Sequence, residues 1–373
     1  MENRELDRIE LGWDESRNQH FEQYRSSGLI PARVAAEHRE RYSLLCEAGE
    51  LSAEVSGRFQ FTALGRSDYP AVGDWVAVAY DSGGGVSIIQ AVLPRRTCFS
   101  RKAVLAGGKA SSGGQTEEQV LAANVDTVFL VSGLDHDFKI RRIERYLAVA
   151  WESGSLPVIV LNKADVCANV EKHIETVGAS APGVAVHPMI ASDGEGVEQL
   201  RQYLTVGKTI ALLGSSGVGK STIINRLCGF ERQDTGGVRL DDSKGRHTTT
   251  KRELILIPEG GMVIDTPGMR QIKLWDDETG LHQSFADVEQ LIAKCRFADC
   301  QHNSEPGCAV REAIETGELD PGRLQNYLKM GREVEALRIR KNVREERQAN
   351  RDRDKRFRRF HRERELLRKN KLI

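Results

Sequence analysis

The chain contains the stretch Gly214-Ser215-Ser216-Gly217-Val218-Gly219-Lys220-Ser221, directly after the apolar run Thr209-Ile-Ala-Leu-Leu213. This stretch matches every fixed position of a phosphate-binding loop between a strand and a helix. Its glycines let successive backbone N–H groups turn toward phosphates, Lys220 reaches the β and γ oxygens, and the Ser221 hydroxyl holds Mg²⁺. The stretch therefore predicts a nucleoside triphosphate site, in which the start of the next helix adds its positive end and Thr222 is a further contact.

A second motif, Asn162-Lys163-Ala164-Asp165, follows a buried-strand pattern at residues 156–161 and predicts which base is bound. The Asp165 carboxylate can accept from N1–H and from the exocyclic amine of guanine, whereas adenine offers an acceptor at N1 and no amine beside it. We expect Lys163 along the base plane and Asn162 as a brace between this loop and the phosphate-binding loop. Alone, the tetrapeptide also fits a surface turn; the phosphate-binding loop favours guanine recognition.

The second wall of the guanine pocket is expected after the strand at residues 185–189. Related GTPases carry Ser-Ala before a Gly-x-Gly run, and this chain has Ile190-Ala191-Ser192 before Gly194-Glu-Gly196. Only Ala191 matches, so its backbone amide is the expected contact to the guanine oxygen.

Two further loops are expected to sense the γ-phosphate and to be released on hydrolysis. Asp265-Thr-Pro-Gly268 follows a strand at residues 261–264, so that Asp265 would reach Mg²⁺ through water and the Gly268 amide would sense the γ-phosphate. The polar stretch at residues 244–250 offers Thr249 or Thr250 for Mg²⁺, and the sequence does not choose between them.

Met269 stands where ordinary small GTPases carry the glutamine that orients the attacking water. Methionine cannot orient water, so His247, in the threonine-containing loop, is the expected catalytic residue. A solvated loop histidine is the alternative. Intrinsic hydrolysis is expected to be slow until a partner orders the loops.

The order of these motifs indicates a circularly permuted GTPase domain. Guanine selection at residues 162–165 precedes the phosphate-binding loop, whereas ordinary GTPases have the reverse order; permutation is feasible because domain termini often lie close together. With this order the sequence resembles the ribosome small-subunit-dependent GTPase A family (RsgA, also called YjeQ) over about residues 29–335. The resemblance implies GTP hydrolysis to GDP, stimulated by the small ribosomal subunit, which couples late subunit maturation to release of the protein. It also implies a catalytic histidine at His247.

The expected fold is a multidomain α/β chain: an OB-fold β-barrel, a permuted P-loop GTPase domain with a largely parallel sheet, and a helical zinc-binding domain with a basic tail. The expected segments are an N-terminal extension at 1–28, the OB-fold at 29–105, a flexible linker at 106–118, the GTPase domain at 119–275, the zinc-binding domain at 276–337 and the tail at 338–373.

The barrel prediction rests on short strands at residues 41–46, 51–55, 57–61 and 72–78. The family resemblance implies an OB-fold here, and Gly73-Asp74-Trp75 resembles its signature. OB barrels bind oligonucleotides through aromatic and basic side chains, and this segment offers Arg58, Phe59, Phe61 and Arg66. A purely structural barrel is the alternative.

A cysteine and histidine cluster follows the GTPase motifs. Cys295, Cys300, His302 and Cys308 lie within fourteen residues, and four such ligands fit one structural zinc ion. The spacing differs from paired Cys-x-x-Cys fingers but matches the zinc site of the family; a cysteine-rich helix end is the alternative. The remaining cysteines are scattered, which indicates free thiols in a reducing cytoplasm.

The 54 Lys and Arg residues balance the 54 Asp and Glu residues over the 373-residue chain, yet residues 338–373 hold 16 basic against six acidic side chains. This net charge of +10 suits phosphate-backbone contact with rRNA, and mixed charges at helical spacing equally suit an exposed helix. No run approaches the roughly 18 apolar residues of a membrane span, so we expect no membrane partner. We also expect a monomer in the cytoplasm. Two rival functions stay open: a free-standing metabolic GTP hydrolase, and an RNA-binding module with a passive nucleotide.

Overall fold

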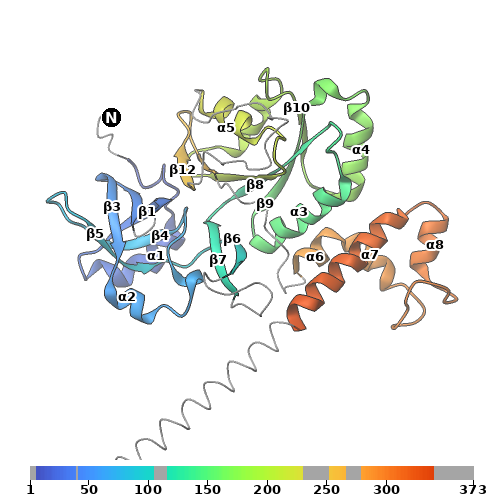
Figure 1. Cartoon of the computed structure of the whole chain (residues 1–373), viewed down its shortest axis with the longest axis horizontal. Helices are drawn as coiled ribbons and strands as arrows, with labels where there is room; N and C mark the ends of the chain where they lie inside the picture. Colours follow the sequence, from blue (N-terminus) through green and yellow to red (C-terminus); the bar gives the residue numbers. More distant parts are fainter. Residues whose placement is uncertain (1–5, 39–40, 105–115, 230–251, 266–278, 340–373) are drawn as a thin grey trace, which may run out of the picture. The chain divides into compact units, whose positions relative to one another are not determined.

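The computed structural model describes residues 6–38, 41–104, 116–229, 252–265 and 279–339, in two compact units, Met1–Lys273 and Leu274–Ile373 (Figure 1). Several predicted residues lie outside the described ranges: His247, Thr249, Thr250, Gly268, Met269 and the tail beyond residue 339.

Five strands form the N-terminal barrel: β1 (Ile30–Glu37), β2 (Tyr42–Cys46), β3 (Gly49–Val55), β4 (Trp75–Ala79) and β5 (Ser87–Val92). They pair in the order β1-β2-β3-β5-β4, and β4 pairs back onto β1, which closes the barrel. Only the β3–β5 pair is parallel among these five strands. Alternate side chains fill the interior, including Val34, Leu44, Ala53, Val76 and Ile89. The OB-like barrel predicted from the sequence is confirmed.

The predicted strand at residues 57–61 is wrong, because these residues form the helix α2 (Gly57–Thr62) between β3 and β4. The Ser56 hydroxyl caps this helix by accepting from the Phe59 N–H at 3.1 Å. Phe59 packs edge to face on Tyr69 at 5.7 Å, whereas Phe61 is 91% exposed. Phe59 therefore has an aromatic packing partner, whereas Phe61 faces solvent.

The predicted N-terminal extension is part of the barrel's packing. Helix α1 (Glu15–Arg25) begins after Asp14, whose carboxylate accepts from the Arg17 N–H. Leu11 and Phe21 are buried in one cluster with Trp75 of β4, and the Trp13 ring lies 4.7 Å from the Trp75 ring. These contacts cover the indole of Trp75, which is 1% exposed.

A two-stranded hairpin joins the barrel to the following domain. β6 (Cys98–Val104) and β7 (Thr116–Ala123) pair antiparallel from Cys98↔Ala123 to Val104↔Thr116. Residues 116–118, which we predicted as part of a linker, therefore lie in a paired strand.

The GTPase-like part of this unit is a mostly parallel sheet in the order β10-β9-β8-β11-β13-β12. Its strands are β8 (Thr127–Gly133), β9 (Leu156–Asn162), β10 (Val186–Met189), β11 (Thr209–Gly214), β12 (Glu253–Leu256) and β13 (Met262–Asp265), and only β12 pairs antiparallel with its neighbour β13. β8 and β11 are buried at every residue, as expected for strands covered on both faces. The predicted parallel α/β sheet is confirmed.

Helices cover both faces of that sheet. Helix α5 (Lys220–Cys228) and the 3-10 helix η4 (Val197–Tyr203) bury Ile223, Leu227 and Leu200 in one cluster with alternate strand residues such as Phe129 and Leu212. Helices α3 (Ile140–Ser153) and α4 (Val170–Ser180) lie on the opposite side of the sheet from α5 (Figure 1).

The barrel and the parallel sheet are continuous. Ala36 of β1 pairs with Glu253 of β12, and an Arg252–Glu37 ion pair at 3.2 Å flanks this contact. Nearby, the buried Arg33 of β1 donates to the Leu11 carbonyl at 2.5 Å and to the Thr209 hydroxyl of β11 at 2.8 Å. A buried guanidinium needs such acceptors, because an unpaired one would carry a large desolvation cost.

The second unit contains α6 (Thr279–Ser284), α7 (Ala286–Ile292), α8 (Ala309–Glu315) and a further helix over residues 321–339. Arg323 is 4% exposed and donates two hydrogen bonds to Asp287, at 2.6 and 2.7 Å, and one to the Ser284 carbonyl. This ion pair, buried at its arginine end, ties the last helix to α6 and α7. Among the helices of the described ranges, none combines the length and apolar character that crossing a membrane requires.

Gly73 provides a test of the barrel packing. Its φ is +90°, and a Cβ there would lie 2.1 Å from the Ala123 carbonyl oxygen, which is backbone and cannot rotate away. We expect Gly73→Ala to lower the free energy of unfolding by at least about 3 kcal/mol. The measurement is urea unfolding followed by tryptophan fluorescence.

The matched control is Gly84→Ala. Gly84 has a similar φ of +80°, but a Cβ there would meet no other atom within 4 Å. It should lose only the left-handed penalty of about 1 kcal/mol. Equal losses in the two variants would contradict the close approach at Gly73.

Candidate functional site

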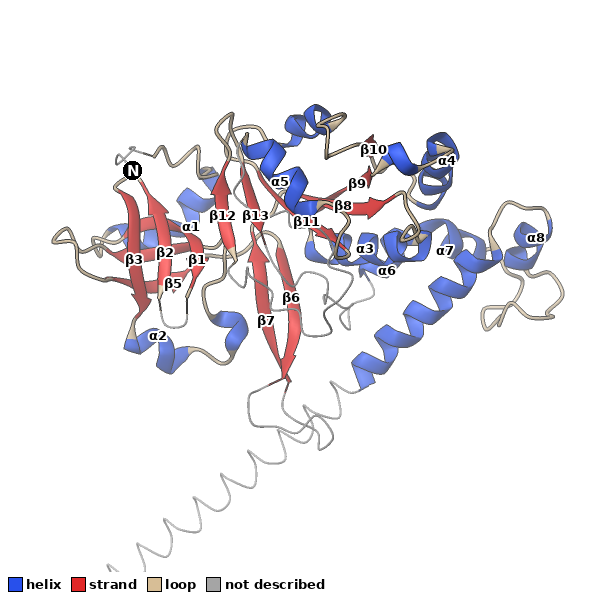
Figure 2. Cartoon of the chain, turned by 45° about the horizontal axis from the view of Figure 1, so that its top comes forward, coloured by secondary structure: helices blue, strands red, loops and turns tan. Residues whose placement is uncertain are grey.

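The predicted nucleotide motifs meet at one edge of the parallel sheet. Gly214 at the end of β11 pairs with Val131 of β8, and Asn162 at the end of β9 pairs with Gly133 of β8. Figure 2 shows β8, β9 and β11 in the same layer. Because parallel strands end at the same edge, both loops leave the sheet side by side, where ligands bind in folds of this type.

The phosphate-binding loop has the backbone that its glycines predict. Gly217 and Gly219 have φ of +76° and +99°, and α5 begins directly afterwards at Lys220. A Cβ on Gly214 would lie 2.4 Å from the Val131 carbonyl oxygen. The Lys220 ammonium donates to the carbonyls of Gly214, at 2.8 Å, and of Ser215. The loop therefore curls around its own lysine at the helix start, the arrangement that accepts phosphates.

Asn162 connects the base-binding loop to the phosphate-binding loop. Its side-chain amide donates to the Val218 carbonyl at 2.8 Å, and its side-chain oxygen accepts from the Ala191 N–H at 2.9 Å. The bracing expected of Asn162 is thus present in the geometry. Gly219 leaves room for this side chain, since a Cβ there would lie 2.2 Å from Asn162 Nδ2.

The expected role of Ala191 needs correction. Its N–H, which we expected to face the guanine oxygen, donates to Asn162 Oδ1, and its side chain is 1% exposed. The Ala191 carbonyl accepts from Arg226 of α5 at 3.2 Å. Both backbone groups of Ala191 therefore hold the loop in place, and the N–H is not available to a base in this conformation.

The two charged residues of the guanine motif lie at the opening of the site. Lys163 has a left-handed φ of +63°, and its ammonium pairs with Asp135 at 2.7 Å. Asp165 lies in the 3-10 helix η3 (Ala164–Val166) and is exposed. The Asp165 carboxylate is therefore accessible next to a lysine that is paired with Asp135.

Sequence reasoning missed three residues of this edge, Asp135, Asp137 and Arg142. Asp137 and Arg142 form a two-pronged ion pair at 2.5 and 2.9 Å, and Arg142 also donates to the Ser215 hydroxyl of the phosphate-binding loop. The hydrogen bond from Arg142 lowers the pKa of Asp137. Burial acts to raise the pKa of Asp135, but the hydrogen bond from Lys163 contributes to a net lowering. The available signal was the position of the two aspartates directly after the buried strand β8.

Of the remaining predicted residues, Asp265 ends β13, and β13 is the neighbour of β11 in the sheet. Ser221 and Thr222 open α5 next to Lys220 and are partly exposed. The structure therefore brings the described members of the predicted nucleotide site to one edge.

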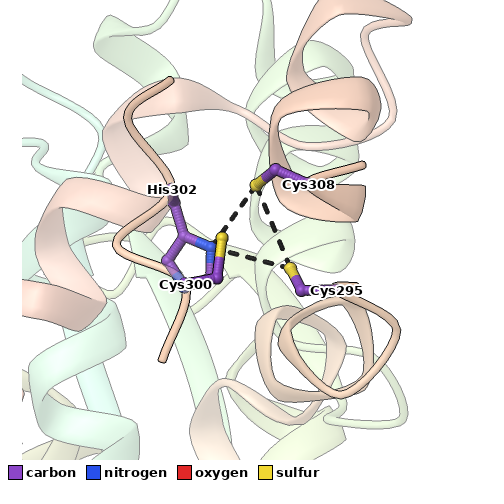
Figure 3. A group of neighbouring side chains, drawn as sticks. All are labelled: Cys295, Cys300, His302 and Cys308. Carbon is purple, nitrogen blue, oxygen red and sulfur yellow. Dashed lines mark hydrogen bonds between the residues drawn. The ribbon is translucent and has the colours of Figure 1, made fainter. Parts of the chain in front are cut away.

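A second site lies in the other unit, where the four predicted metal ligands converge (Figure 3). Their ligand atoms lie within 4.8 Å of one another. Cys295 Sγ lies 3.9 Å from Cys308 Sγ, and His302 Nδ1 lies 3.7 and 3.5 Å from these two sulfurs. A tetrahedral zinc ion with bonds of about 2.3 Å to sulfur and about 2.1 Å to nitrogen places sulfurs about 3.8 Å apart and sulfur about 3.6 Å from nitrogen. The donor set fits zinc.

The loop that carries these ligands is shaped by its own backbone. His302 has a left-handed φ of +61°. The Glu305 carboxylate accepts the N–H groups of Gln301, Asn303 and Ser304 at 2.9 to 3.0 Å, and these hydrogen bonds lower its pKa to about 2. The Arg296 N–H donates to the Gly307 carbonyl at 3.1 Å. These contacts hold the turn in the shape that aims the ligands inward.

Comparisons with known proteins identify the family of the chain. Residues 92–275 match the family model of the RsgA GTPase. A protein of Opitutus terrae named small ribosomal subunit biogenesis GTPase RsgA is 49% identical, over 87% of this chain and 88% of its own length. A protein of the same name from Syntrophotalea carbinolica is 43% identical, over 87% and 89%. The crystal structure of YjeQ from Thermotoga maritima superposes with a TM-score of 0.60 at 28% identity, over 82% of this chain and 98% of YjeQ.

The metal site yields a direct test. We expect the purified protein to carry one zinc ion per chain and Cys300→Ser to carry none, because three ligands bind zinc far more weakly than four. Zinc content is measured by mass spectrometry of the acid-digested protein. Chelation should likewise open residues 295–308 to proteolysis.

The control for this test is Cys98→Ser, since Cys98 is a free thiol of β6 that belongs to the other unit. It should keep the zinc of the unmodified protein. Full zinc content in Cys300→Ser would contradict the assignment of this ligand.

Proposed function

This chain belongs to the RsgA GTPase family, and we propose that it binds the small ribosomal subunit and hydrolyses GTP to GDP and phosphate when bound there. Hydrolysis would couple late maturation of the subunit to release of the protein. The carrying observation is Asn162, which joins the guanine motif to the phosphate-binding loop through two hydrogen bonds. In an isolated surface turn with the sequence Asn-Lys-x-Asp, the asparagine side chain would not make these two hydrogen bonds to distant loops.

The proposed nucleotide contacts combine this geometry with the sequence motifs. Asp165 accepts from the base, Lys163 lies along it, and residues 214–222 hold the phosphates with Lys220 on the β and γ oxygens. Mg²⁺ is held by the Ser221 hydroxyl and by Thr249 or Thr250, with Asp265 reaching it through water. The exposure of Asp165 and the position of Asp265 at the end of β13 support these roles.

We assign His247 as the catalytic residue, because Met269 cannot orient the attacking water. We assign the Gly268 amide as the group that senses the γ-phosphate. These residues lie outside the described ranges, so their support is the sequence pattern and the family. A loop that needs an external partner to order it makes hydrolysis dependent on that partner.

The other parts of the chain serve binding to the subunit and its rRNA. The barrel exposes Arg58, Phe61 and Arg66, a combination suited to stacking and phosphate contact. The second unit, held by one structural zinc ion, and the basic segment at 338–373 add further rRNA contacts. We also propose that the protein acts as a monomer in the cytoplasm.

Two rivals make different predictions. A free-standing metabolic hydrolase turns over GTP efficiently without RNA, whereas an RNA-binding module with a passive nucleotide binds RNA equally well with GDP and with GTP. The barrel disfavours the first rival. The position of Asp265 in the strand next to the phosphate-binding loop disfavours the second.

The decisive experiment measures GTP hydrolysis with and without small ribosomal subunits. We expect stimulation by more than about tenfold, equivalent to at least about 1.4 kcal/mol of barrier. Large subunits and Lys220→Ala, which loses the phosphate contact, are the negative controls. An unchanged rate with small subunits would remove the proposed coupling.

A second test addresses the catalytic histidine. His247→Ala should bind GTP as tightly as the unmodified protein and hydrolyse it about 100-fold more slowly on the small subunit. Affinity is measured with a fluorescent GTP analogue and turnover by phosphate release. The control is His20→Ala, on the exposed side of α1. Normal turnover in His247→Ala would sink the assignment.

A further inference from the structure

The turn between β8 and α3 contacts both the guanine motif and, through Arg142, the phosphate-binding loop. The first contact is made by Asp135, whose carboxylate accepts from the Asp137 N–H at 3.0 Å and from the Lys163 ammonium at 2.7 Å. Gly133 permits this arrangement, because a Cβ there would lie 2.9 Å from Asp135 Oδ1. The Asp135 side chain is 16% exposed and the Lys163 side chain 36% exposed, so the ion pair is partly shielded from water at its carboxylate end.

The second contact is made by Arg142, on the first turn of α3. Its guanidinium is held by the two oxygens of Asp137 and donates to the Ser215 hydroxyl, the second residue of the phosphate-binding loop. Two parallel hydrogen bonds to a carboxylate fix the plane of the guanidinium. Arg142 is therefore aimed at Ser215 by Asp137.

Asp135 and Arg142 contact two residues whose own backbone does not hold them firmly, Lys163 and Ser215. Lys163 stands in a left-handed conformation, which is uncommon for a lysine. Ser215 lies in a loop whose glycines make its backbone easily deformed. Lys163 is held by Asp135 of the turn, and Ser215 is held by Arg142, which Asp137 of the same turn orients, although the two loops are more than fifty residues apart in the sequence.

We propose that Asp135, Asp137 and Arg142 are positioning residues for the bound guanine nucleotide. Asp135 holds Lys163 at the height of the base, and Arg142, oriented by Asp137, holds the phosphate-binding loop through Ser215. This inference rests on the proposed GTP binding and deepens it, because it gives base recognition and phosphate binding a common support.

The test is the dissociation constant of a fluorescent GDP analogue. Asp135→Asn and Arg142→Met should each weaken binding about tenfold, the usual effect of losing a hydrogen bond to a charged group. Arg142→Lys should recover part of the loss, since an ammonium can reach Ser215 but cannot pair in parallel with Asp137. In hydrolysis the KM should rise while kcat on the small subunit stays constant.

Double variants separate positioning from general destabilisation. In a Ser215→Ala background, Arg142→Met should cause no further loss, and in a Lys163→Met background, Asp135→Asn should cause none. A tenfold further loss in these backgrounds would overturn the inference. Should Arg142→Met not fold, Arg142→Lys and Asp137→Asn carry the same cycle.

The matched control is Arg201→Met. Arg201 is 22% exposed, close to the 24% of Arg142, and pairs with Glu198 and Glu259 at 2.9 and 2.7 Å. Glu259 lies in the turn before β13, at the other end of that strand from Asp265, so this variant should keep full affinity. Failure of the unmodified protein to bind the analogue would refute the proposed function itself. Normal binding by the unmodified protein, by Asp135→Asn and by Arg142→Met would refute only this inference.

Discussion

The nucleotide site depends on one buried side chain, the amide of Asn162. It is 4% exposed, and its two hydrogen bonds connect the carboxyl end of β9 to the phosphate-binding loop and to the loop after β10. Each such bond contributes only about 1 kcal/mol, but loss of the amide would leave buried backbone groups unpaired on both neighbours. Asn162 thus sets the relative positions of the phosphate-binding loop and the loop after β10.

The features that were predictable from the sequence are those written in short-range patterns. A phosphate-binding loop needs glycines at fixed spacing between a strand and a helix, so residues 214–221 predicted β11 and the start of α5 at Lys220. The motif order predicted the permuted sheet, and four metal ligands within fourteen residues predicted the cluster in the second unit. In each case the chemistry constrains residues that are near one another in the chain.

The features that escaped prediction depend on partners far away in the chain. Whether Phe61 faces a core or solvent is decided by how β3 and β4 are connected, and the local alternation of aromatic residues carries no information about that. The Ala191 N–H finds its acceptor 29 residues upstream, and Arg142 meets Ser215 73 residues downstream. Such contacts follow from the register of the parallel strands, which a single sequence does not specify.

The pairing of β1 with β12 connects the barrel directly to the sheet that carries the nucleotide motifs. β12 is the first strand after the threonine-containing stretch, and its Glu253 is bonded to Ala36 of the barrel wall. The barrel wall and the chain that leaves the threonine-containing stretch therefore meet in one strand pair. By thermodynamic reciprocity, a nucleotide that shifts β12 alters the grip of the barrel by the same free energy with which the partner alters the grip on nucleotide. Such a coupling through β12 has no fixed order, since either the nucleotide or the partner can bind first.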